Sequence, residues 1–186
     1  MSILIVSSSS LSKSRSGGLA LTLDRVITQA RAEVELFDIE TAHLPPANSR
    51  IHAEIVDVRV SSFRSSVANS CGLVLVTPVY HGSPSGLLKS ALDFLPRSAL
   101  GGKAIGLMVF ADSLIGVTAC DQLRCMVRAM GGSAMPTQIV AQPADLEPDR
   151  PEFSILLKRM LRLSDELLAF VGSKTEPFGN EGVTDS

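Results

Sequence analysis

The chain has 186 residues, the length of one ordinary domain with a single hydrophobic core. Hydrophobic residues make up 45% of it and charged residues 19%, which excludes a disordered chain. The 17 Lys and Arg residues nearly balance the 19 Asp and Glu residues, so a net charge of -2 offers no basic surface for nucleic acid or for an anionic membrane. Aromatic residues are scarce, at 4%, with no Trp and one Tyr. Any flat ligand must therefore be held mainly by backbone and aliphatic groups.

The order of the residues adds two exclusions. The longest stretch without a formal charge, residues 65–88, contains Pro78 and Pro84 and lacks the roughly 20 mostly apolar residues of a bilayer span. No membrane helix is expected. Residues 1–6 have no basic group ahead of a short apolar run, so no secretory signal is expected and the cytoplasm is the expected location.

The cysteines do not form a recognisable framework. Cys71, Cys120 and Cys125 are odd in number, show no C-x-x-C spacing and lie in apolar or helix-like surroundings. The sequence therefore predicts three buried structural thiols, with neither a disulfide framework nor a metal site.

Short apolar runs alternate along the chain with segments whose apolar residues recur every three or four positions. In chain order, the patterns predict a strand at 3–6, a helix at 18–32, a strand at 34–37, a helix at 50–68, a strand at 72–77, a helix at 83–95, a strand at 103–110, a helix at 114–130, a strand at 134–140 and a helix at 151–171. Ser83 is the expected N-cap of the third helix, with Pro84 at its first position and Pro96 beyond its end. Gly131 is expected to stop the fourth helix and Gly172 to cap the last.

Strands that are apolar throughout and alternate with helices are typical of a parallel sheet covered on both faces. The expected fold class is α/β, a flavodoxin-like three-layer sandwich with a five-stranded parallel sheet in the order 2-1-3-4-5. We expect one domain over residues 1–172. Residues 173–186 have no apolar period and read as a mobile C-terminal tail.

In such sheets the ligand lies beyond the carboxyl ends of the strands, so the loop after the first strand is the first candidate for ligand binding along the chain. Residues 7–16 hold seven serines, together with Lys13 and Arg15, ahead of a helix. Hydroxyl and amide donors at a helix N-terminus favour an anion, and a terminal phosphate is the natural ligand. A serine-rich turn that only caps the helix is the alternative. The pattern is neither a P-loop nor a G-x-G-x-x-G fingerprint.

The loop after the third strand carries the only Tyr of the chain. Its sequence from Thr77 to Pro96 is TPVYHGSPSGLLKSALDFLP. This stretch resembles the TP-x-Y-x-x-S-x-x-G-x-LK-x-x-L-D-x-L signature of the NADPH-dependent FMN reductase family, whose members have a flavodoxin-like fold. Residues 95–103 extend the likeness, most closely to flavin reductases that supply reduced FMN to two-component alkanesulfonate monooxygenases. The resemblance covers about residues 2–171 and is strongest over 72–106.

The resemblance implies where FMN would bind. The first loop would hold the FMN phosphate with Ser8, Ser14, Arg15 and Ser16, although Ser7 stands where the family usually has glycine. The second loop would face the flavin ring with Pro78, Val79, Tyr80, His81 and Ser83. His81 replaces an Asn found in many members; it is either a ring-side donor or an ordinary surface turn residue.

The third loop departs from the family pattern. Members often have Gly-Gly after the fourth strand, where this chain has Ala111, Asp112 and Ser113. By the resemblance, these three residues are still expected to lie against the flavin ring. Asp112-Ser113 is otherwise explained as the N-cap of the following helix. Beside the pyrimidine, the Asp112 charge would lower the flavin reduction potential. Residues 102–132 are one residue short of members with an interrupted fourth helix, so an unbroken helix and tightly held FMN are expected.

The expected activity is hydride transfer from NADPH or NADH to FMN, which supplies reduced flavin to a partner monooxygenase. The flavin itself accepts the hydride and passes on its electrons, so the sequence predicts no catalytic side chain and no metal. A quinone or azo reductase that retains FMN is one alternative. The other is a non-catalytic flavodoxin-like binding protein whose flavin site is degenerate, as Ser7 and Asp112 suggest. Apolar faces of the last two helices predict a homodimer or homotetramer.

Overall fold

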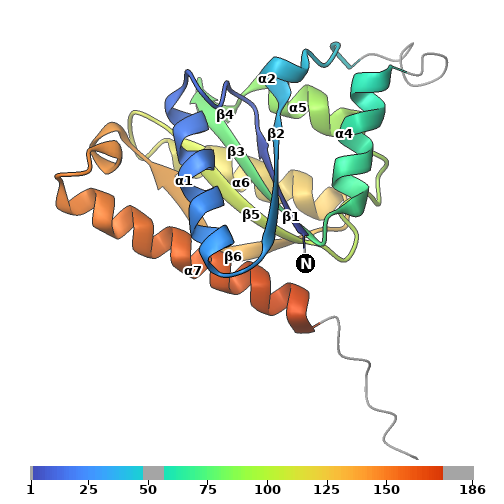
Figure 1. Cartoon of the computed structure of the whole chain (residues 1–186). Coiled ribbons are helices and arrows are strands. Elements are labelled where there is room, and N and C mark those ends of the chain that lie inside the picture. Colours follow the sequence, from blue (N-terminus) through green and yellow to red (C-terminus); the bar gives the residue numbers. More distant parts are fainter. Residues whose placement is uncertain (1, 48–56, 174–186) are drawn as a thin grey trace, which may run out of the picture.

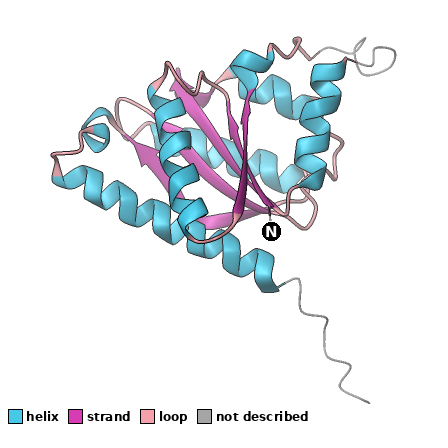
Figure 2. Cartoon of the chain, in the orientation of Figure 1, coloured by secondary structure: helices cyan, strands magenta, loops and turns pink. Residues whose placement is uncertain are grey.

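Five parallel strands form the middle layer of the protein, and helices cover both faces (Figures 1 and 2). The structure is a computed structural model that describes residues 2–47 and 57–173. Its elements are β1 (Ser2–Ser7), α1 (Arg15–Gln29), β2 (Glu33–Asp38), α2 (Ile39–Ala42), α4 (Val58–Asn69), β3 (Gly72–Tyr80), β4 (Ser83–Pro84), α5 (Gly86–Asp93), β5 (Ala104–Phe110), α6 (Gly116–Ala129), β6 (Ser133–Ala141), the short 3-10 helix η1 (Pro143–Leu146) and α7 (Pro151–Ser173).

The parallel strands lie in the order β2-β1-β3-β5-β6, which confirms the expected order when β5 and β6 are counted as the fourth and fifth parallel strands. A sixth, two-residue strand, β4, pairs antiparallel with the end of β3 and was not expected. In Figure 1, α1 and α7 lie on one face of the sheet, and α4, α5 and α6 lie on the other. The flavodoxin-like fold class is therefore confirmed, and the carboxyl ends of β1, β3 and β5 meet at one edge.

The central strand β3 shows why apolar runs predicted this sheet. Leu73 and Leu75 pack in the core on the α4, α5 and α6 side, whereas Val74 and Val76 pack toward α1 and α7. All four side chains are fully buried. A strand buried on both faces cannot alternate apolar with polar residues. Edge strand β2 is only partly buried.

Two of the predicted helix boundaries are wrong. Ser83 and Pro84 form β4 instead of opening a helix, because they pair with Tyr80 and Val79. The N-cap of α5 is Ser85, whose Oγ accepts from Leu88 N at 3.2 Å. At the other end of the chain, α7 runs through Gly172 to Ser173. The expected tail at 174–186 lies outside the described residues.

Other boundaries agree with the sequence patterns. Gly131 has a positive φ of 78° just beyond α6, as a helix stop requires. α1 begins three residues earlier than expected because Ser14 caps it. The helix expected at 50–68 is α4, and residues 48–56 lie outside the described residues. No described helix is long and apolar enough to cross a membrane.

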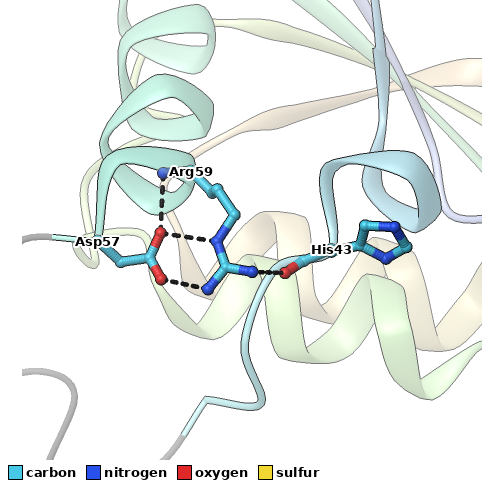
Figure 3. Close-up of polar contacts among 3 residues, drawn as sticks. All are labelled: His43, Asp57 and Arg59. Atoms are coloured by element: carbon cyan, nitrogen blue, oxygen red, sulfur yellow. Dashed lines mark hydrogen bonds and ion pairs between the residues drawn. The ribbon is translucent and has the colours of Figure 1, made fainter.

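An ion pair holds the start of α4 against the end of α2 (Figure 3). The Asp57 carboxylate accepts from Arg59 N at 2.8 Å and from the Arg59 guanidinium at 2.6 and 3.0 Å. The same guanidinium donates to the backbone oxygen of His43 at 2.6 Å. Hydrogen bonds from Arg59 lower the pKa of Asp57 from 3.8 to about 2. Because this pKa is depressed, the Asp57–Arg59 ion pair persists above pH 4 and is lost only as the pH falls toward 2.

The prediction of three buried thiols is wrong for two of them. Cys71 and Cys125 are exposed, and only Cys120 is buried. Cys71 directly precedes β3, and Cys125 lies on the outer side of α6, where neither strand nor helix covers its side chain. Burial raises the pKa of the Cys120 thiol to about 11, so this group stays protonated and unreactive.

These exposures predict how the thiols react. In native protein at mild alkaline pH, Ellman's reagent should modify Cys71 and Cys125 within minutes and leave Cys120 untouched, because the reactive species is an accessible thiolate. Denaturation should release the remaining thiol. Mass spectrometry of the labelled peptides identifies the sites, and rapid labelling of Cys120 in native protein would contradict the structure.

Candidate active site

A cleft of about 290 Å³ opens where the loops after β1, β3 and β5 converge. Its size is at the lower end of small-molecule sites. The residues that line it are Ser9, Ser14, Arg15, Ser16, Pro78, Val79, Tyr80, Phe110, Ala111 and Asp112. All of these except Ser9 and Phe110 were predicted from the sequence. The structure thus brings together three loops that are far apart in the chain, at residues 9–16, 78–80 and 110–112.

The first loop delivers hydrogen-bond donors to one end of the cleft. Ser14 caps α1: its Oγ accepts from Gly17 N at 2.9 Å and donates to Ser10 O at 2.8 Å. The next two amides, of Arg15 and Ser16, have no partner inside a helix because they belong to its first turn. No acidic residue occupies that turn. The N-terminus of α1 is therefore suited to an anion.

Two carboxylates that the sequence reasoning missed hold the outer half of this loop. Glu40 Oε2 accepts from Ser10 N at 2.7 Å, and Asp38 Oδ2 accepts from Leu11 N at 3.1 Å. Asp38 also caps α2 through its other oxygen. Two amides of the loop are thus already bonded, which leaves the anion to the inner half beside α1. The available signal was that Asp38 directly follows the strand expected at 34–37.

Ser8 was predicted to contact phosphate, but it lies beneath the cleft instead of lining it. Its side chain is buried, and its Oγ donates to Thr77 Oγ1 at 2.9 Å and accepts from Ser85 Oγ at 2.7 Å. Ser85 N donates to the same Thr77 oxygen at 3.0 Å. This hydroxyl cluster joins the first loop to the second.

The second loop is a tight hairpin formed by the end of β3 and by β4. His81 and Gly82, its two turn residues, both have positive φ, 51° and 75°. Two-residue hairpins favour such turns because their twist matches that of the strands. Outside glycine, positive φ is commonest for Asn, Asp and His, which accounts for His81 where many family members have Asn. His81 and Ser83 do not line the cleft, whereas Tyr80 stands at its rim with 60% of its surface exposed.

The third loop closes the cleft with one buried and one charged residue. Ala111 is buried, and its N donates to Ala141 O at 3.0 Å, which ties the loop to β6. Asp112 lines the cleft, and Ser113 does not. The interpretation of Asp112-Ser113 as a helix cap is wrong, because α6 begins only at Gly116 after a separate turn and has no side-chain cap. As expected, α6 is an unbroken α-helix.

Arg15 spans the cleft from the first loop to the third. Its guanidinium carbon lies 5.6 Å from the centre of the Phe110 ring, a cation–π contact. Arg15 is in none of the ion pairs found among residues 2–47 and 57–173. Its charge therefore remains available to an anion at the start of α1. No group of three potential metal ligands occurs in the same described ranges.

A doubly wound parallel sheet with a donor-rich cleft at its carboxyl edge defines a flavodoxin-like protein. The chain belongs to the NADPH-dependent FMN reductase family, whose model matches residues 1–146. It is therefore an oxidoreductase that works with FMN and a nicotinamide nucleotide, as the sequence analysis predicted.

A relative supports this assignment, and solved structures share the fold. An FMN-dependent NADPH-azoreductase of Staphylococcus haemolyticus is 31% identical over 150 residues, which cover 76% of each chain. An oxidoreductase from Corynebacterium diphtheriae superposes with a TM-score of 0.80 at 23% identity, covering 92% of this chain and 97% of that one. An NADH:FMN oxidoreductase in its apo form gives 0.68 at 24% identity, covering 95% and 91%.

The residues of the cleft fit FMN. Unused helix amides, two serines and a guanidinium form one end, which suits a phosphate. Peptide groups of residues 78–80 form the facing wall and suit the polar edge of a planar ring. Apart from Tyr80 and Phe110, no aromatic side chain lines the cleft.

Two adjacent glycines of α1 test the packing of the first loop. A Cβ on Gly17 would lie 2.1 Å from Ser10 O, whereas a Cβ on Gly18 would meet no atom within 4 Å. Gly17→Ala should displace the loop, destabilise the protein by about 1–3 kcal/mol and weaken FMN binding. Gly18→Ala should raise stability by up to about 1 kcal/mol. Urea unfolding and FMN titration measure both, and equal behaviour of the pair would contradict the close approach.

Proposed function

We propose that this protein transfers a hydride from NADPH or NADH to FMN held in the cleft between the three loops. One observation carries the proposal: the N-terminus of α1, with Ser14, Arg15 and Ser16, faces the Pro78–Tyr80 wall within a single cleft. An anion-binding end and a ring-binding wall are what a flavin mononucleotide requires. Bound FMN supplies the hydride-accepting and electron-donating chemistry.

At the phosphate end, Arg15 and Ser16 supply the side-chain donors, and Ser14, whose hydroxyl already donates to Ser10 O, caps the helix and lines the cleft. The first-turn amides add two more donors, aligned with the helix dipole. Arg15 contributes the full positive charge, and its stacking on Phe110 keeps the guanidinium inside the cleft. Ser8 acts from beneath, where its buried hydroxyl fixes the loop.

At the ring end, the protein binds and orients the flavin ring and leaves one face of that ring open. Pro78 stiffens the wall, and the peptide groups of Val79 and Tyr80 contact the ring. Ala111 and Asp112 border it from the third loop. The nicotinamide would lie against the face of the ring that these loops leave open. His81, Ser83 and Ser113 lie outside the lining, so we assign them to the loops that frame the site.

A visible spectrum tests the function. Purified protein mixed with FMN should retain the yellow flavin absorbance through gel filtration, and NADPH or NADH should bleach it anaerobically. A colourless protein that neither binds FMN nor oxidises NADPH would instead support the non-catalytic alternative, a flavodoxin-like binding protein with a degenerate site.

An azo compound is the second candidate acceptor. It is favoured by the relatives named FMN-dependent NADPH-azoreductases, of which one is 31% identical to this chain. Quinones belong to the same alternative. Rates of NADPH oxidation with free FMN, a quinone and an azo dye, each at saturation, discriminate among these acceptors. The proposal of a partner monooxygenase is based on the sequence resemblance of residues 77–103. A coupled assay tests it by measuring whether the monooxygenase turns over with NADPH as the source of electrons.

We also propose a homodimer or homotetramer located in the cytoplasm. Large apolar side chains remain exposed near α6 and on α7, among them Leu114, which is 71% exposed, Ile115, Ile155 and Leu161. Single exposed residues are ordinary, but Leu114 and Ile115 adjoin before α6 and Ile155 and Leu161 lie on α7, so each face of the sheet offers an apolar surface that supports a contact between copies. Light scattering of purified protein gives the assembly order.

Arg15 tests the phosphate end. A charged hydrogen bond contributes about 1.5–3 kcal/mol, so Arg15→Met should weaken FMN binding by roughly 10- to 100-fold. Riboflavin, which lacks the phosphate, should bind the variant nearly as well as it binds the wild type. Arg25→Met, an exposed position on the same helix, is the matched control. Equal losses for FMN and riboflavin would show that Arg15 does not serve the phosphate.

A further inference from the structure

The tip of the β3–β4 hairpin is tied to α6 by two side chains. The carbonyl oxygen of Gly82 accepts from Thr118 Oγ1 at 2.8 Å and from Gln122 Nε2 at 3.2 Å. Positions four apart lie on the same side of a helix, so the two donors converge on one acceptor. Neither donor lines the cleft, yet their acceptor is two residues from Tyr80, which does.

Contacts with α6 hold the tip of this hairpin. β4 has only two residues, and the hydroxyl cluster around Thr77 secures only the base. At the tip, Ile115 packs beside Gly82, where a Cβ would lie 3.6 Å from Ile115 Cγ1. Ile115 belongs to the segment that joins β5 to α6. Contact with α6 therefore connects the second loop to the third.

We propose that Thr118 and Gln122 are positioning residues of the flavin site, which set the spacing between its Tyr80 wall and its Asp112 wall. The inference rests on the proposed function. Both walls line the cleft, one on the hairpin and the other directly before the turn that opens α6. Fixing Gly82 to α6 fixes one wall relative to the other.

The two donors share the task unequally. Thr118 Oγ1 also lies 2.7 Å from Ile115 O, and a single hydroxyl proton cannot serve both carbonyls fully. The Gln122 amide maintains the contact when the hydroxyl turns toward its own helix. Removal of one donor should therefore have a smaller effect than removal of both.

The position of this contact predicts which part of the flavin responds. It acts on the ring walls and not on the serine loop, so FMN and riboflavin should lose affinity by the same factor. Arg15→Met, by contrast, should discriminate between them. The flavin absorbance band should also shift, because the polar groups around the ring move.

The test uses Thr118→Val combined with Gln122→Leu, which removes both donors while nearly keeping their shapes. Two ordinary hydrogen bonds correspond to a loss in affinity of roughly 5- to 100-fold for both flavins. At saturating FMN, kcat should fall several-fold, and the KM for NADPH should change less. Thr118→Ser, which keeps the hydroxyl, should restore most of the Thr118→Val loss.

Thr22→Val is the matched control, because the Thr22 hydroxyl bonds only to Gly18 O within α1, at 2.9 Å. Its flavin affinity should equal that of the wild type. The double variant should stay folded at the assay temperature, although the loss of two tertiary hydrogen bonds lowers its melting temperature. Unchanged flavin affinity and kcat in the double variant would overturn the proposal. A loss of flavin affinity in Thr118→Val that Thr118→Ser does not relieve would overturn it as well. A wild-type protein that binds no FMN refutes the proposed function itself, before any variant is compared.

Discussion

Three buried hydroxyl groups, of Ser8, Thr77 and Ser85, join the two loops that face each other across the cleft. Ser8 directly follows β1, Thr77 lies in the second half of β3, and Ser85 is the N-cap of α5. A buried hydroxyl without a partner is costly, so the three groups stabilise the structure only together. Their geometry places the start of α1 opposite the Tyr80 hairpin. The remaining features of the site, including the anion-binding turn and the α6 contact, depend on that placement.

The serine loop shows how one short segment divides its donors. Its outer amides bond to Asp38 and Glu40, which belong to the second strand and the helix after it. Its inner end forms the first turn of α1. Carboxylates hold the loop in shape but bring negative charge close to the phosphate end, so the binding of an anion relies more heavily on Arg15.

Local patterns predicted the strands and helices, whereas the strand order was inferred from the fold class and most of the cleft residues from the family resemblance. Fully apolar runs such as Leu73–Val76 appear only where both faces are covered, and the carboxyl ends of such strands form one edge. The features that the sequence reasoning missed depend on contacts between distant residues. Ser8 looked like a phosphate ligand because nothing local reveals its bond to Thr77, 69 positions away.

Local signals also misled where two structures compete for the same residues. Ser83-Pro84 has the pattern of a helix start, yet pairing with Tyr80 and Val79 makes it a strand. Asp112-Ser113 has the pattern of a helix cap, but α6 starts later, at Gly116. A Cβ at this position would lie only 2.6 Å from Val140 Cγ1, so the close packing requires glycine. Exposure of Cys71 and Cys125 follows from the helix and strand boundaries and not from composition.

The stacking of Arg15 on Phe110 has a kinetic consequence. A long side chain that must be immobilised by its ligand loses conformational entropy on binding, and this cost weakens the complex. Phe110 holds the guanidinium over the cleft before any anion arrives. The site is thus preorganised to bind the phosphate. A charged group that is already in position speeds the encounter with this dianion and also raises the binding affinity. Such a site captures the phosphorylated form of the flavin quickly and favours it over riboflavin, which lacks the phosphate.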